Sequence, residues 1–130
     1  MTTKRNKNYN SLIMQAFGEK PVAFNPMLAE VARCPMAGLF LSQLLFWWGK
    51  GSRREGMIFK TIKEMQSETH LSRSRQSRAI AIWKKLGVVE VEYHDVPRRR
   101  YFRINEDRLI ELLERISGRG YGAENDSGTC

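Results

Sequence analysis

Leu71-Ser-Arg-Ser-Arg-Gln-Ser-Arg-Ala-Ile-Ala-Ile-Trp-Lys-Lys-Leu-Gly87 is the stretch of sequence that decides the fold. It predicts one helix over residues 72–86. Ser72 is a good N-cap because its hydroxyl accepts a hydrogen bond from a backbone N–H of the first turn, and Gly87 suits the left-handed residue that ends a helix. Apolar residues at helical spacing predict a stripe that faces a core, formed by Ala79, Ile80, Trp83 and Leu86. The opposite face, with Ser74, Arg78, Ala81 and Lys85, is expected to be exposed.

The charge on this helix has a single sign. Between Leu71 and Gly87 the sequence has five basic residues and no acidic one. A helix that only faces solvent usually mixes the two signs, because Glu–Lys pairs support helices. The chain of 130 residues has a net charge of +8, and this helix is its main source. Clustered basic charge on an exposed face favours a polyanion as the partner.

The sequence before this helix predicts another helix. Thr61-Ile-Lys-Glu64 has the form of a capping box, and the helix it starts is expected to reach about Glu68. Residues 69–71 then form a short turn into Ser72. Two helices joined by such a turn make a helix-turn-helix.

Two strands are predicted after the helix-turn-helix. Residues 88–93 and 99–104 are rich in Val, Tyr, Phe and Ile, and the segment between them includes Pro97, a turn residue. Residues 57–60 predict a further short strand. The fold class expected is therefore mostly α with a small antiparallel β-sheet (α+β). A helix-turn-helix followed by a basic hairpin is the winged form.

An ordered series of motifs between residues 23 and 114 resembles the winged helix-turn-helix domains of bacterial, phage and plasmid DNA-binding proteins. The motifs are Thr61-Ile-Lys-Glu-Met65, Leu71-Ser72, Ser77-Arg-Ala-Ile80, Gly87-Val-Val89 and Tyr101-Phe-Arg-Ile-Asn105. Asn25-Pro-Met-Leu-Ala29, with Gln43-Leu-Leu-Phe-Trp-Trp48, is similar to the version found in phage and plasmid replication and regulatory proteins. The sequence departs from the pattern at Gln76, where an apolar core residue is usual, and at Trp83, where Leu is usual.

The whole chain is expected to form one domain with two tails. The domain spans residues 20–116, residues 1–19 form a flexible basic arm, and residues 117–130 form a flexible tail. Phosphate contacts by the arm are an alternative to simple disorder. Within the domain, residues 34–49 carry no charge and predict a buried central helix, and residues 105–116 predict a last helix.

The resemblance and the basic clusters together predict the DNA-binding residues. In the recognition helix they are Ser72, Arg73, Ser74, Arg75, Ser77, Arg78 and Lys85, of which those from Arg73 to Arg78 lie nearest the base edges. Thr61, Lys63 and Lys85 are expected to touch phosphates. The wing, residues 94–100, is expected to place Arg98, Arg99 and Arg100 on the DNA backbone or in the minor groove. Arg103 is assigned instead to an ion pair with Glu90 or Glu92 across the hairpin.

These residues predict a sequence-specific double-stranded DNA-binding protein that acts as a transcriptional regulator. One alternative is a plasmid or phage replication-initiation or origin-binding protein. Another is a winged-helix protein-interaction module of a mobile element, which contacts its partner through Phe46, Trp47 and Trp48. A homodimer is a further expectation, through residues 105–116 or the helix at 39–48.

Several kinds of chemistry lack a signal in the sequence. His70 and His94 have no companions at metal-ligand spacing, and no phosphate-binding glycine loop is present, so neither an enzyme, a metal, a cofactor nor a small-molecule ligand is expected. The uncharged run at 34–49 is shorter than the roughly 20 residues of a membrane span. Cys34 and Cys130 are too few for a disulfide framework, and Cys34 is expected to pack in the core. A reducing, cytoplasmic, nucleoid-associated location fits these features.

Overall fold

The structure is a computed structural model, and it describes residues 23–50, 53–54 and 56–119. Within these ranges the chain forms five helices, α2 (Pro26–Ala32), α3 (Pro35–Gly49), α4 (Ile62–Thr69), α5 (Arg73–Lys85) and α6 (Glu106–Arg119). It also forms four strands, β1 (Arg53–Arg54), β2 (Met57–Phe59), β3 (Val89–His94) and β4 (Arg99–Ile104). The expected α+β class is therefore confirmed. The expected arm at 1–19 lies outside the described residues, and α6 continues past the expected end at 116.

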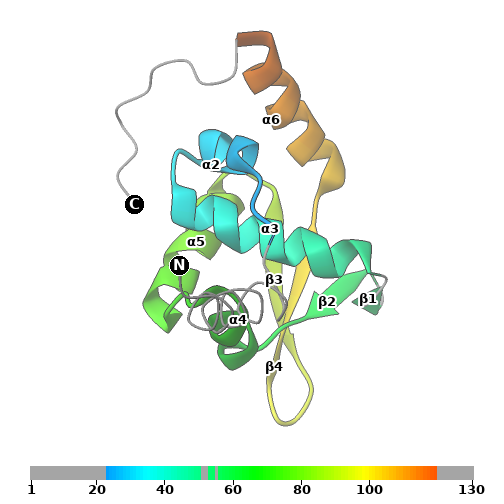
Figure 1. The fold of residues 1–130 in the computed structure, drawn as a ribbon. Coiled ribbons are helices and arrows are strands. Elements are labelled where there is room, and N and C mark those ends of the chain that lie inside the picture. Colours follow the sequence, from blue (N-terminus) through cyan, green and yellow to red (C-terminus); the bar gives the residue numbers. More distant parts are fainter. Residues whose placement is uncertain (1–22, 51–52, 55, 120–130) are drawn as a thin grey trace, which may run out of the picture.

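Helix α3 crosses the middle of the molecule, as Figure 1 shows. Helices α2 and α6 lie on one side of it, and α4, the start of α5 and the loop of the β3–β4 hairpin lie toward the other. The strands form one antiparallel sheet in the order β1-β2-β4-β3. The short strand β2 pairs with β4, so the predicted third strand is confirmed. The hairpin therefore belongs to the body of the domain at its base and projects from it at its loop.

The corner between α2 and α3 is built from local capping. Asn25 Oδ1 accepts a hydrogen bond from the Met27 backbone N–H at 2.9 Å. Gly38 has no room for a side chain, because a Cβ there would lie 2.6 Å from the backbone nitrogen of Ala29. The missing Cβ lets α2 and α3 pack in close contact. At the start of α3, Cys34 is buried, as expected.

The two helices of the predicted helix-turn-helix form where the sequence places them. Thr61 and Glu64 make the expected capping box at the start of α4. His70 ends α4 with a positive φ of 66°, and the Ser72 hydroxyl caps α5 by accepting from the Arg75 backbone N–H at 3.3 Å. The side chains of Thr61 and Ser72 each accept a hydrogen bond from a backbone N–H of the first helical turn, which otherwise lacks a partner. Residues 70–72 thus form the turn between two capped helices.

The core joins α3, α5, the sheet and α6. Trp83 is fully buried and donates its indole N–H to the backbone oxygen of Ala37 in α3 at 2.8 Å. The rings of Phe40 and Phe102 meet edge to face with centroids 5.8 Å apart, which joins α3 to the sheet. Leu109 and Leu112 of α6 are buried in the same cluster. The apolar stripe of α6 is therefore used within the chain, and it leaves less surface than expected for a second copy.

The aromatic end of α3 is also held within the chain. Trp47 donates its indole N–H to Glu68 of α4 at 3.0 Å, and Trp48 donates to Glu106 of α6 at 3.0 Å. Burial alone would raise the pKa of Glu68, but hydrogen bonds from Lys60, Gln43 and Trp47 outweigh it and lower this pKa below its ordinary value. Of the three adjacent aromatic residues, only Phe46 is exposed. None of the helices in the described ranges is long and apolar enough to cross a membrane.

Candidate nucleic-acid interface

The outward face of α5 is polar and basic. Successive residues lie about 100° apart around a helix, and this spacing puts the buried residues Gln76, Ala79 and Trp83 on one side of α5. Opposite them lie four predicted site residues, all of them exposed, namely Ser74, Ser77, Arg78 and Lys85. This face therefore presents hydroxyl groups and cations with no carboxylate from α5 among them.

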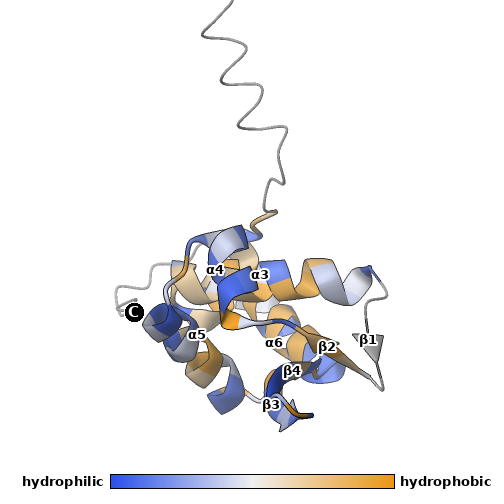
Figure 2. Cartoon of the chain, turned by 90° about the horizontal axis from the view of Figure 1, so that it is seen from below, coloured by the Kyte–Doolittle hydropathy of each residue, from blue (hydrophilic) through white to orange (hydrophobic). Residues whose placement is uncertain are grey.

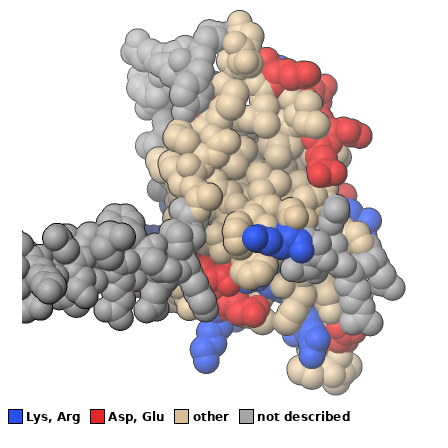
Figure 3. All heavy atoms as spheres, turned by 45° about the vertical axis from the view of Figure 1, so that its right-hand side comes forward, with Lys and Arg blue, Asp and Glu red and all other residues tan. Residues whose placement is uncertain are grey.

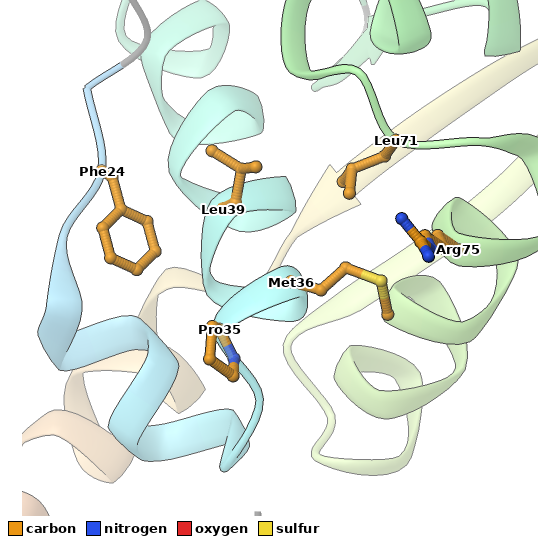
Figure 4. A pocket seen from close by; sticks show the side chains of 6 residues that line it. All are labelled: Phe24, Pro35, Met36, Leu39, Leu71 and Arg75. Carbon is orange, nitrogen blue, oxygen red and sulfur yellow. The ribbon is translucent and has the colours of Figure 1, made fainter. Parts of the chain in front are cut away.

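The other arginines of α5 lie on its two flanks. Arg73 is exposed and close enough to Arg100 of β4 for its charge to lower the pKa of that residue. Arg75 is also exposed, and its side chain points toward a pocket on the α3 side (Figure 4). This open pocket of about 500 Å³ is lined by Phe24, Pro35, Met36, Leu39, Leu71 and Arg75. The predicted base-reading residues thus point in three directions, and Arg78 is the arginine on the outward face.

The two sites predicted at the start of α4 differ in what they can offer a phosphate. Lys63 is exposed on the first turn of α4. Thr61 is engaged in its own cap, because its hydroxyl accepts from the Glu64 backbone N–H at 2.9 Å and bonds the Glu64 carboxylate at 3.1 Å. A hydroxyl committed to a carboxylate is a poor phosphate ligand. The geometry therefore favours Lys63 over Thr61.

The loop end of the hairpin carries two exposed arginines. The Arg98 guanidinium lies 4.1 Å from the centre of the Tyr93 ring, and the Arg99 guanidinium lies 5.2 Å from that of Phe59. These cation–π contacts orient both side chains and leave them accessible. Below them, Tyr101 donates its hydroxyl hydrogen to Asp95 at 2.8 Å and ties the loop to β4.

Arg103 and Arg100 of β4 lie in different surroundings. Arg103 lies opposite Glu90 in the strand register and makes an ion pair with Glu92 at 3.6 Å, so its assignment to a cross-strand pair is confirmed. The expectation that Arg100 is part of an exposed tip is wrong, because this residue is only 7% exposed. Arg100 shares a face of β4 with Phe102 and Ile104, both of which are buried in the core.

The buried side of α5 contains a residue that sequence reasoning did not assign to the site. Gln76 is fully buried, and its amide nitrogen donates to the backbone oxygens of Ile62 at 3.0 Å and Leu71 at 2.9 Å. Its amide oxygen accepts from Arg100 at 3.0 Å. The signal was present as a polar residue at a core position of the helix, together with an arginine on the core face of a strand.

The polar segments gather at one end of the molecule. Seen from below, in Figure 2, α4, one end of α5 and the neighbouring hairpin show strongly hydrophilic segments. In Figure 3 one group of acidic side chains lies at the upper end, which α6 occupies in Figure 1, and others lie at the lower end among the basic side chains. The exposed acidic residues of α6 are Glu106, Asp107, Glu111 and Glu114. Helix α5, which has no acidic residue, and the hairpin loop with the exposed Arg98 and Arg99 therefore form a candidate surface for an anionic partner.

The part of the chain that the structure describes has no candidate metal site, because no group of three or more potential metal ligands lies together there. Comparisons of the chain with family models, with curated proteins and with solved structures give no significant match. What the chain does must therefore be inferred from its own residues and their geometry.

Proposed function

We propose that this protein is a sequence-specific double-stranded DNA-binding protein with a winged helix-turn-helix fold, and that it acts as a transcriptional regulator. Helix α5 enters the major groove, which is wide enough to admit a helix. The loop of the β3–β4 hairpin lies on the flanking backbone or in the minor groove. Lys63 and Lys85 make phosphate contacts beside the helix.

The observation that carries this proposal is the outward face of α5. Ser74, Ser77 and Arg78 stand exposed on a helix whose other side is fixed by the fully buried Trp83. An arginine in the major groove can bind O6 and N7 of guanine with two hydrogen bonds, and serine hydroxyls can read several base edges. The exposed Arg98 and Arg99 supply cations at a second point of contact. A reading helix and a clamping loop at one end of the molecule match what duplex recognition requires.

Selection of bound duplexes from a random DNA pool tests the proposal. We expect the selected sequences to converge on one motif, which the protein binds more tightly than random DNA in an anisotropy titration. A pool that remains random after repeated rounds would contradict sequence-specific recognition. The position of the motif then separates a regulator from an origin-binding protein, because the first recognises a promoter operator and the second an array of origin repeats.

Replacing Arg98 and Arg99 together by alanine is expected to weaken binding to selected and random DNA by similar factors. Both side chains contact phosphate in the proposed complex, and phosphate carries no sequence information. The slope of log affinity against log salt should become shallower by about two units, one for each lost charge. The melting temperature should stay close to that of the wild type, since both residues are exposed. A variant that loses binding only to the selected site would make the hairpin a reader of bases.

In the interaction-module alternative Trp47 and Trp48 would contact a partner protein, but both already make contacts within the chain. The indole N–H groups of Trp47 and Trp48 are bonded to carboxylates of the same chain. Retention on heparin or DNA separates the two functions. A DNA-binding protein elutes late and its elution depends steeply on salt, whereas a protein-interaction module with no anionic partner elutes early.

A further inference from the structure

A buried hydrogen-bonded pair joins the hairpin to the helix-turn-helix. Arg100 of β4 donates from Nη2 to the Gln76 amide oxygen at 3.0 Å and from Nε to the backbone oxygen of Lys60 at 3.0 Å. Gln76 in turn donates to the backbone of Ile62 and of Leu71. Two side chains therefore connect four places, namely β4, the entry to α4, the turn before α5, and α5 itself.

The charge of Arg100 is unusual for a buried group. Among the described residues no carboxylate forms an ion pair with it, and its hydrogen-bond partners are an amide oxygen and a backbone oxygen. Burial, together with the nearby positive charge of Arg73, lowers the pKa of Arg100 to about 10, although Tyr93 opposes part of this shift. At neutral pH the guanidinium is still charged. A long apolar side chain would fill the same space without the cost of burying a charge. The hydrogen bonds of the pair fix the orientation of both side chains, which apolar packing alone does not do.

The position of the pair decides what it can orient. Arg100 is the buried residue of β4 that lies closest to the loop, because residues 93–99 are all exposed. The Lys60 backbone N–H also donates to the Arg100 backbone oxygen at 3.1 Å, so this residue is held on both sides. On the other partner, Gln76 lies one turn before Ala79 on the inner face of α5. The pair therefore stands where the loop end of the hairpin meets the helix.

We propose that Gln76 and Arg100 are positioning residues, which fix the direction of the loop end of the hairpin (residues 94–99, the loop with one strand residue on each side) relative to α5. In the DNA complex, which rests on the function proposed above, Arg100 touches no phosphate. It acts through Gln76, so that Arg78 and the loop arginines Arg98 and Arg99 meet one duplex at the same time. The free protein is then already shaped for DNA, and binding does not need to order the loop.

The test compares Gln76→Leu, Arg100→Met and the double variant with the wild type. Replacing both partners of a buried hydrogen bond by apolar groups can be nearly neutral for stability, whereas removing one leaves the other unsatisfied. We expect each single variant to melt at a lower temperature and the double variant to regain at least half of the loss. Arg99→Met is the matched control, since it removes the neighbouring charge from an exposed position of the same strand.

Orientation is measured without DNA, by residual dipolar couplings of the backbone N–H groups. In the wild type, α5 and the loop should fit one alignment tensor. In the double variant the couplings of residues 94–96, 98 and 99 should shrink although stability has returned, and in Arg99→Met they should not; Pro97 has no N–H to measure. Wild-type couplings in the double variant would show that the pair only stabilises the fold, and would overturn the proposal. Because this arm uses no DNA, it decides the proposal even if the protein binds none.

Binding to the selected duplex gives the second readout. The double variant should bind about tenfold more weakly with an unchanged salt slope, because a loose loop must be ordered on binding but no phosphate contact is lost. Arg99→Met should instead make the slope shallower by about one unit. A shallower slope in Arg100→Met with normal couplings would make Arg100 a phosphate ligand and contradict its positioning role. Should the double variant fold poorly, Arg100→Lys replaces it, with couplings expected between those of wild type and Arg100→Met, and wild-type couplings would count against the proposal.

Discussion

Replacing Trp83 by alanine is expected to lower the free energy of unfolding by about 3–5 kcal/mol, the cost of truncating a large buried aromatic residue. The ring is fully buried, and its indole N–H bonds the Ala37 backbone oxygen at 2.8 Å. The substitution therefore leaves a cavity between α3 and α5 and also an acceptor in α3 without its partner. A small domain has only about 5–15 kcal/mol of stability in total. The variant should therefore be partly unfolded at temperatures at which the wild type is still fully folded.

Urea denaturation followed by circular dichroism measures this effect. Lys84→Ala is the matched control, because it is the next residue on the same helix and is exposed. The control should change the free energy of unfolding by less than about 0.5 kcal/mol, as surface substitutions usually do. A loss below about 1 kcal/mol in Trp83→Ala would mean that α5 is not anchored through this residue. The assignment of the outward face of α5 would then also be wrong.

Salt is expected to weaken DNA binding steeply. Seven cations of the proposed interface are exposed, namely Lys63, Arg73, Arg75, Arg78, Lys85, Arg98 and Arg99. If about five of them neutralise phosphates, log affinity should fall against log salt with a slope of roughly −4 to −5. Between 50 and 200 mM salt the affinity should then fall about 250- to 1,000-fold. Anisotropy titrations of one duplex at four salt concentrations give the slope, and a slope near zero would contradict the proposed binding to DNA.

Local chemistry made the helix boundaries predictable from the sequence. A cap needs only a few neighbouring residues, so Thr61 with Glu64 and Ser72 mark the starts of α4 and α5 correctly. Strand pairing at Arg103 was predictable for the same reason, since the two strands of a hairpin are neighbours in the chain. These elements position the candidate site, and they are predictable because capping residues and periodicity are both local features of the sequence.

The burial of Arg100 was missed because two signals in the sequence compete. Three adjacent arginines beside a turn favour an exposed basic tip, yet the alternation of β4 puts Arg100 on the face of Phe102 and Ile104. The partner that makes its burial tolerable, Gln76, lies 24 positions away in the sequence. A contact over that separation depends on how α5 and the sheet pack. For this reason the fold was more predictable than the division of arginines between the surface and the core.

The central claim is that the outward face of α5 reads bases, and the Arg78→Ala variant tests it most directly. Its affinities for the selected duplex and for random DNA are measured side by side at one salt concentration. Arg115→Ala serves as the control, since it removes the same charge from an exposed position on α6. We predict that Arg78→Ala narrows the gap between the two affinities by about 1–3 kcal/mol, the value of one bidentate base contact, and that the control leaves it unchanged. An Arg78→Ala protein that folds normally and keeps the full gap would contradict the account.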